Sequence, residues 1–387
     1  MSNPAAIAHN ILDLFSPTRA GLTRGSAKVP PADRWIWFSA MFLMALGSVM
    51  VLSSSVMLAD RKFGSPGFFW TRQLIWWGLA TAILVGVSRI DHRKFKTWAP
   101  LLLLVGFGLV ILARLMPTIK DVHRWIDLGP FRLQPAEVFR LAFVIYAAAF
   151  FSGVKERISS FSFGLLPLLV LLSLAWALLL LEPDTDTFVV LFAALLAIFF
   201  AAGGKLKQLG ILCVVAAIAL GSLIAMRPYL KERFLTFIDP GKDPQGAGYQ
   251  IEQSLIAIGS GGFFGRGFGQ SVQKFSYLPE PIGDSIFAVA GEEFGFFGAS
   301  LLIMLFLAFL LRGLRVASRA PDSFARLLTV GIVILIGASA FINIASMLGL
   351  IPLSGLTLPL VSHGGSALAI TLASAGVVLN ISRYQKI

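Results

Sequence analysis

The residues of this sequence that could do chemistry are a few acids and arginines inside or at the ends of long apolar segments. Glu137 and Arg140 stand three residues apart in 'LQPAEVFR', Asp184 lies in the turn 'EPDTDT', and Asp284 precedes an apolar run in 'LPEPIGDSIFAVAG'. Ionisable residues at membrane depth are costly and usually functional. A carboxylate at the edge of an apolar cavity has the environment that raises a pKa toward that of a general base. The pattern therefore predicts acid–base chemistry at a membrane boundary.

Each of these residues also has a structural interpretation that spacing leaves open. Glu137 and Arg140 fall on one face of a helix, where they could form an ion pair and nothing more. Asp184 and Asp284 each stand where an aspartate commonly caps the start of a helix. Arg72, in 'FFWTRQLIWW', could be an interfacial arginine that reaches the lipid headgroups.

The patterns of metalloenzymes, serine hydrolases and nucleotide-binding proteins are missing from the sequence. Its four histidines lie in separate segments without zinc-ligand spacing. G-x-S-x-G does not occur, and the glycine-rich run Gly259 to Gly269 fits neither a P-loop nor a dinucleotide-binding motif. Cys213 is the only cysteine, which excludes an internal disulfide. We therefore expect no protein-built metal site and no nucleotide cofactor.

The composition indicates that these residues belong to a polytopic membrane protein. Of 387 residues, 57% are hydrophobic and 13% are charged, whereas an ordinary soluble domain has about 25% charged residues. We expect an all-α fold of about ten transmembrane helices, because ten apolar segments approach the length that crosses a bilayer. The predicted spans are residues 35–58, 68–90, 98–116, 136–153, 161–182, 187–203, 207–226, 284–311, 325–350 and 359–382.

Lysines and arginines predict the orientation of these spans. An even number of spans puts both termini on one side of the membrane. The loops on that side hold 18 lysines and arginines, against 5 in the short loops on the opposite side. Cytoplasmic loops carry the excess, so both termini are expected in the cytoplasm, with a tail at 1–34 and a short end at 383–387. One membrane domain covers 35–382, and its long loop 227–283, between the seventh and eighth helices, is extracytoplasmic. The net charge of +12 then reflects orientation and contact with anionic lipids rather than nucleic acid.

Glu292 and Glu293 follow Asp284 by about two and a half helical turns. They are expected at membrane depth unless this helix starts in a water-filled vestibule.

Four strings, in order along the chain, resemble the SEDS family (shape, elongation, division and sporulation). The resemblance covers about residues 35–382. The strings are 'RWIDLGPFRLQPAE' (Arg124 to Glu137), 'GYQIEQSLIAIGSGGFFGRGFG' (Gly248 to Gly269), 'LPEPIGDSIFAVAGEEFG' (Leu278 to Gly295) and 'NIASMLGLIPLSGLTLPLVSHGGS' (Asn343 to Ser366).

The resemblance implies a peptidoglycan glycosyltransferase that polymerises lipid II on the outer face of the cytoplasmic membrane. It implies a class B penicillin-binding protein as partner, with other divisome membrane proteins and membrane lipids as neighbours. The segment 'RPYLKERFLTFIDPGKDPQGAGYQ' (Arg227 to Gln250) is more similar to the division members, FtsW, than to the elongation members, RodA. Septal wall synthesis at the inner membrane is therefore expected, with an elongation-type polymerase as the alternative.

The resemblance also implies roles for single residues. The essential aspartate of the family matches Asp284, which we expect to act as general base on the acceptor hydroxyl of lipid II. The charged pair after 'QP' matches Glu137 and Arg140, and the acid of the usual 'QPDLGT' turn matches Asp184. Glu137 and Asp184 are expected to organise the cavity or position the acceptor.

Cations are needed for the leaving diphosphate. The candidates are Arg72, Arg124 and Arg140. The alternative clamp is a divalent cation, Mg or Mn, carried partly by the diphosphate itself.

Some positions depart from the family pattern. His-Thr usually precedes the essential aspartate and Phe follows it, whereas Ile282, Gly283 and Ser285 stand here, and His363 replaces a usual Tyr. These departures leave the acidic positions intact but put in doubt a histidine role beside Asp284.

A lipid II flippase is the competing function, because ten helices with intramembrane charges also suit transport. The chain shows no convincing internal repeat of the kind common in transporters. Asp184 and Asp284 are also expected at the outer lip rather than at mid-bilayer, which favours catalysis.

Overall fold

The computed structural model describes residues 32–116, 124–129, 131–181, 184–239, 241, 243, 246–275 and 277–385. The predicted N-terminal tail up to residue 31, His123 and Glu182 lie outside these ranges.

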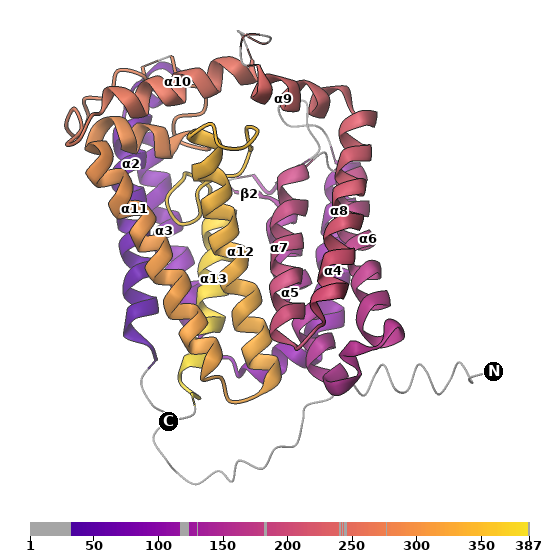
Figure 1. Cartoon of the computed structure of the whole chain (residues 1–387). Coiled ribbons are helices and arrows are strands. Elements are labelled where there is room, and N and C mark those ends of the chain that lie inside the picture. The colour runs from indigo at the N-terminus through magenta and orange to yellow at the C-terminus, as the bar shows by residue number, and fades with distance from the viewer. Residues whose placement is uncertain are drawn as a thin grey trace.

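Each of the ten predicted spans is confirmed as a helix. Seven of the described helices, α2, α4, α5, α8, α11, α12 and α13, are long and apolar enough to cross a membrane, and α3, α6 and α7 complete the bundle. Figure 1 shows these helices running side by side between the two ends of the molecule. The bounds are α2 Arg34–Phe63, α3 Phe68–Val87, α4 His92–Leu115, α5 Pro135–Val154, α6 Leu166–Leu181, α7 Thr185–Ala201, α8 Leu206–Met226, α11 Ile286–Ser318, α12 Ser323–Met347 and α13 Gly365–Ser382.

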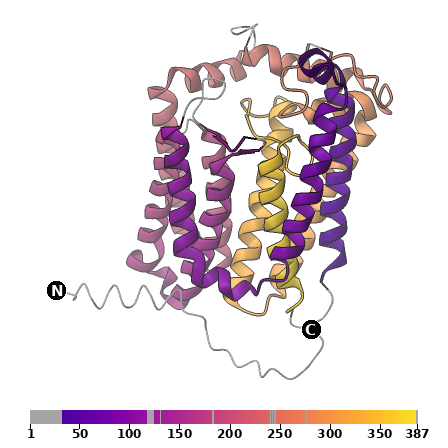
Figure 2. The ribbon, with the colours of Figure 1, turned by 180° about the vertical axis from the view of Figure 1, so that it is seen from behind.

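The helices divide into a buried centre and an apolar periphery. In the most apolar stretch of α13, 83% of the residues are buried, against 17% in α8. Figures 1 and 2 show α12 and α13 between a flank of α2, α3 and α11 and a flank of α4, α6 and α8. Because no water reaches a bilayer core, outward apolar side chains face lipid while polar groups turn inward.

One end of the bundle gathers the start of α2 and the ends of α11 and α13. The backbone N–H of Asp33 donates to Ser382 Oγ at 2.9 Å, and the Asp33 carboxylate pairs with Arg312 at 2.8 Å. The first and last spans therefore begin and finish at the same end, as an even number of spans predicts.

Two helices that the sequence did not predict cross the opposite end, α9 (Pro228–Ile238) and α10 (Ala247–Ser260). We call it the α9–α10 end. The sequence predicts a single long loop over 227–283, because neither helix is long or apolar enough to resemble a span. Pro228 stands in the first turn of α9, where its missing N–H costs nothing. A two-stranded hairpin, β1 (Ile126–Asp127) and β2 (Arg132–Leu133), precedes α5.

The glycine-rich run after α10 pairs with a break in α11. Gly295 has φ 66° and ψ −163°, a conformation open to glycine. Around it, Arg266 N–H donates to Glu292 O at 3.0 Å and Phe296 N–H donates to Gly262 O at 2.9 Å. The first part of α11 is thus held to the preceding loop by backbone contacts.

Glu292 and Glu293 are fully buried in this packing rather than open to a vestibule. The Glu292 carboxylate accepts from Ser271 Oγ at 2.6 Å and from Val272 N–H at 2.9 Å. Glu293 pairs with Lys274 Nζ at 2.6 Å. Buried carboxylates with such partners are structural groups.

The first prediction concerns the contact between α2 and the loop before α13. A Cβ added at Gly47 would lie 2.5 Å from Val361 Cα and 2.6 Å from Val361 O. Because backbone atoms there have no room to yield, Gly47→Ala should destabilise the protein by at least about 1–3 kcal/mol. The measurement is the thermal unfolding midpoint of the purified protein in detergent.

Gly78→Ala is the matched control, since Gly78 lies in the neighbouring helix α3 with no heavy atom within 4 Å of the added Cβ. Its midpoint should stay constant or rise slightly, because alanine favours helix. Equal midpoints for the two variants would contradict close packing at Gly47.

Candidate functional site

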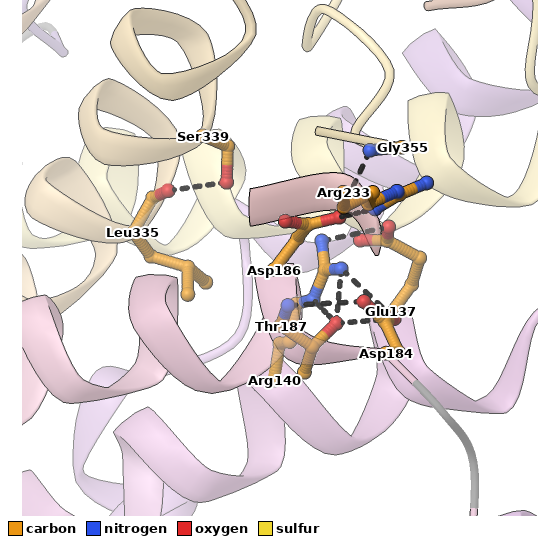
Figure 3. A network of polar contacts seen from close by, with 9 residues as sticks. All are labelled: Glu137, Arg140, Asp184, Asp186, Thr187, Arg233, Leu335, Ser339 and Gly355. Atoms are coloured by element: carbon orange, nitrogen blue, oxygen red, sulfur yellow. Dashed lines mark hydrogen bonds and ion pairs between the residues drawn. The ribbon is translucent and has the colours of Figure 1, made fainter. Parts of the chain in front are cut away.

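Arg140 lies at the centre of a buried polar network between α5 and α7 (Figure 3). Its Nη1 pairs with Glu137 Oε1 at 3.0 Å, and its Nη2 lies 3.7 Å from Asp184 Oδ2. Its Nε donates to Thr187 Oγ1 at 2.9 Å, and its Nη2 also donates to that hydroxyl. The ion pair predicted from the i, i+3 spacing of Glu137 and Arg140 is confirmed, but it belongs to a larger network.

Asp184 caps α7, so the helix-cap interpretation is confirmed for this residue. Its Oδ1 accepts from Thr187 N–H at 3.1 Å, and its Oδ2 accepts from Thr187 Oγ1 at 2.6 Å. Burial acts to raise the pKa of Asp184, but the Arg140 guanidinium and the hydrogen bonds from Thr187 outweigh burial and leave this pKa below its ordinary value. Asp184 therefore stays ionised and organises the network.

Asp186, two residues further along α7, points toward a different set of groups. Its Oδ2 accepts from the Gly355 N–H at 2.9 Å and lies 3.7 Å from Arg233 Nη1. Arg233 comes from α9 and lies over the ring of Tyr229 at 5.2 Å. Spacing alone assigned no role to Asp186 and none to Arg233. The one local signal for Arg233 is the i, i+4 spacing from Tyr229 on α9.

The segment that carries Asp284 is fixed by its backbone. Asn343 Nδ2 donates to Asp284 O at 2.8 Å, Ser362 Oγ to Gly283 O at 2.7 Å, and His363 N–H to Ile282 O at 2.9 Å. The helix-cap interpretation of Asp284 is wrong, because α11 begins at Ile286 and Ser285 occupies the cap position. The Asp284 carboxyl is therefore not committed to holding a helix end.

The half-buried Asp284 carboxyl has a pKa suited to proton transfer near neutrality. Burial, followed by the charges of Glu280 and Asp186, raises this pKa to about 7, although Arg233 and Arg124 act in the opposite direction. A general base works best with a pKa near the working pH.

A cavity at the α9–α10 end brings most of the predicted site residues together. We call it the outer cavity. Asp284 lies beside it, with Oδ2 4.0 Å from the position that a Cβ of Gly355 would take. A second cavity, between α5, α12 and α13, shares Glu137, Arg140 and Thr357 with it. The outer cavity is lined by Arg124, Gln134, Glu137, Arg140, Asp184, Asp186, Tyr229, Arg233, Gly355, Leu356 and Thr357.

Arg124 and Arg72, both predicted to serve the diphosphate, are placed differently. Arg124 lines the outer cavity. Arg72 is an exposed residue of α3 whose guanidinium lies over the Phe68 ring at 5.1 Å, and it does not line either cavity in the described part of the chain. Arg233, which the sequence did not single out, lines the outer cavity beside Arg124.

His363 lies near the Asp284 segment, and its imidazole is neutral near pH 7. Burial, with a smaller effect of Arg72, lowers the pKa of His363 to about 4. Its Nδ1 lies 2.9 Å from Gln73 Oε1. Across the described ranges, no group of three or more His, Cys, Asp or Glu residues is placed to hold a metal ion.

Comparison with protein families gives one match over nearly the whole chain. The model of the FtsW, RodA and SpoVE family, described as cell cycle protein, matches residues 33–387.

Relatives of similar length carry related names. Stage V sporulation protein E of Bacillus subtilis strain 168 is 38% identical over 365 residues, covering 93% of this chain and 100% of that protein. A probable peptidoglycan glycosyltransferase FtsW of Thioalkalivibrio sulfidiphilus is 40% identical over 358 residues, covering 91% of this chain and 89% of that protein.

Solved structures share the fold. A chain of a peptidoglycan synthase complex, described as coordinating polymerization and crosslinking, superposes with a TM-score of 0.76 at 26% identity, covering 92% of this chain and 99% of that one. The rod shape determining protein RodA of Thermus thermophilus superposes with a TM-score of 0.68 at 25% identity, covering 92% and 98%.

The second prediction concerns the Arg140 network. Arg140→Met should destabilise the protein by about 3–5 kcal/mol, because it leaves Glu137 and Asp184 buried without their cation. Thermal unfolding in detergent measures the loss. Adding Asp184→Asn should restore part of it, because one unpaired charge is removed.

Arg132→Met is the control, since Arg132 pairs with Asp127 on the exposed hairpin. It should change stability by no more than about 0.5 kcal/mol. A network that tolerated Arg140→Met as well as this control would not depend on the buried guanidinium.

Proposed function

The chain belongs to the FtsW, RodA and SpoVE family of cell cycle proteins, and from that premise we propose that it is a peptidoglycan glycosyltransferase that polymerises lipid II. Relatives named peptidoglycan glycosyltransferase FtsW, at 38–40% identity over more than nine tenths of the chain, support this activity. They also favour a role in division, while the similarity to RodA keeps elongation as the alternative.

One observation carries the catalytic part of the proposal. Asp284 is a half-buried carboxyl with a pKa raised to about 7, and it adjoins a cavity that contains several arginines. In contrast, Asp184 is committed to the α7 cap and to Arg140. Of these two predicted acids, Asp284 is the one with the proton affinity of a general base.

The proposed reaction is a single displacement. Asp284 takes the proton from the 4-hydroxyl of the acceptor N-acetylglucosamine as its oxygen attacks C1 of the muramic acid at the growing end. The new bond joins that oxygen to C1, the bond from C1 to the phosphate oxygen breaks, and undecaprenyl diphosphate leaves with the electron pair. The configuration at C1 is inverted.

The leaving diphosphate requires positive charge in the outer cavity. Arg140 is surrounded by Glu137, Asp184 and Thr187. Arg124 and Arg233 also line this cavity, and Arg233 has one carboxylate, that of Asp186, at 3.7 Å. Guanidinium groups match phosphate oxygens in charge and geometry. We therefore assign the diphosphate to Arg124 and Arg233 rather than to Arg72.

We infer the side of the membrane from the distribution of lysines and arginines. The loops opposite the α9–α10 end carry the larger number, which supports an extracytoplasmic site. The similarity to a chain of a peptidoglycan synthase complex supports a class B penicillin-binding protein as the crosslinking partner.

The third prediction is the loss of polymerisation in Asp284→Asn. General-base catalysis is worth about 10²–10⁴ in rate, so the variant should lose at least that factor while keeping its thermal unfolding midpoint. The measurement is glycan formation from fluorescent lipid II by protein reconstituted with its cognate transpeptidase.

Asp60→Asn, at an exposed acid of α2 at the same end, should retain the wild-type rate. The same vesicles can be scored for lipid II scrambling, which a polymerase should leave at the protein-free level. Full polymer yield from Asp284→Asn would remove the general-base assignment, and scrambling without polymer from the wild type would favour the flippase.

The fourth prediction is the pH dependence of the wild-type rate. A base works when deprotonated, so the rate should rise with pH through a midpoint near 7, the pKa of Asp284, rather than near 3.8. Initial rates between pH 4 and 9, under single-turnover conditions, test this. A rate that is already at its plateau at pH 5 would contradict the raised pKa.

A further inference from the structure

Three charged side chains from different elements converge on Gly355. A Cβ added there would lie 3.7 Å from Asp186 Oδ2, 3.8 Å from Arg233 Nη2 and 4.0 Å from Asp284 Oδ2. Asp186 belongs to α7, Arg233 to α9, and Asp284 to the segment before α11. The backbone of Gly355 therefore lies where two carboxylates face one guanidinium.

Of the two acids, Asp186 and Asp284, it is Asp186 that forms an ion pair with the Arg233 guanidinium. Arg233 Nη1 pairs with Asp186 Oδ2 at 3.7 Å, and the side chain lies over the Tyr229 ring. Asp186 is in turn anchored by the Gly355 N–H at 2.9 Å (Figure 3). Both side chains are largely buried, with 19% of Asp186 and 24% of Arg233 exposed. Gly355 N–H, Asp186 and Arg233 are therefore joined in one chain of contacts, in which the ion-pair partner of Arg233 is Asp186.

We propose that Asp186 is a positioning residue that holds the Arg233 guanidinium away from Asp284, so that the Asp284 carboxylate meets the acceptor hydroxyl without a salt-bridge partner. The proposal rests on the proposed function, in which Asp284 is the general base.

The physical reason is competition for one cation. A carboxylate with an opposite charge within about 4–6 Å typically has its pKa lowered by about 1–3 units, which makes it a weaker base. Asp186 opposes this lowering of the Asp284 pKa in two ways. It pairs with Arg233, and it adds a negative charge of its own near Asp284.

The other charged groups around Asp284 do not replace Asp186 and Arg233. Glu280 lies in the same turn as Asp284 and, like Asp186, raises the pKa of Asp284. Arg124, like Arg233, lowers this pKa. Arg140 also acts on Asp186, but it is held by Glu137 and Asp184.

The test is the pH profile of lipid II polymerisation for the full-length protein with its cognate transpeptidase. Asp186→Asn removes the charge but keeps an oxygen that can accept from Gly355 N–H. We expect its midpoint to fall by about one pH unit or more and its plateau rate to fall severalfold, because Arg233 is released toward Asp284. Arg233→Gln should shift the midpoint upward, and the double variant should return it toward the wild-type value.

Several outcomes would overturn the proposal. These are an unchanged or raised midpoint in Asp186→Asn, or shifts of the same sign in both single variants. A merely structural role for Asp186 would lower the amount of folded protein and leave the midpoint constant. If Asp186→Asn fails to fold, the sign of the shift in Arg233→Gln decides, and a downward or absent shift there rejects the inference.

Asp284→Asn and Asp60→Asn in the same series separate this inference from the proposed function. Absence of polymer from the wild-type protein removes the proposed function, whereas activity retained in Asp284→Asn removes only the general-base assignment on which this inference rests. Loss of activity in Asp284→Asn, with no shift of midpoint in Asp186→Asn, removes only the role of Asp186.

Discussion

A charge buried between apolar helices must be paired with groups of opposite charge. In this protein the Arg140 guanidinium is such a buried charge. Glu137, Asp184 and Thr187 all turn toward it, which ties the start of α5 to the start of α7. These groups satisfy one another within the network. Asp186 and Asp284 face a different set of groups, around Gly355 and Arg233.

Environment separates carboxylates that look alike in the sequence. Asp184 is held ionised by a cation and by hydroxyl and amide donors, whereas burial and neighbouring acids raise the pKa of Asp284. Glu292 and Glu293 are fully buried and paired with donors from the preceding loop. Asp184 and Asp284 therefore differ in proton affinity because the two carboxyl groups meet different partners.

The position of Asp284 depends on backbone contacts from distant parts of the chain. Asn343 on α12 and Ser362 before α13 hold the segment Gly283–Asp284, and the break at Gly295 turns the first part of α11 against the glycine-rich run. Tertiary contacts therefore fix the position of Asp284, and its carboxyl group does not cap a helix.

The sequence alone is sufficient to predict the ten spans, their even number and a contact between Glu137 and Arg140. Apolar length and helical periodicity, on which these predictions rest, are local properties. The motif and the place before an apolar run singled out Asp284 as a candidate. The helix-cap interpretation of Asp284 was wrong, and no local pattern pointed to Arg233 beside Asp186. Whether an acid is capped, paired or left as a base depends on groups brought from α9, α12 and the Gly355 segment. Only the tertiary structure joins these groups, since proton affinity is decided by burial and by charges distant along the chain.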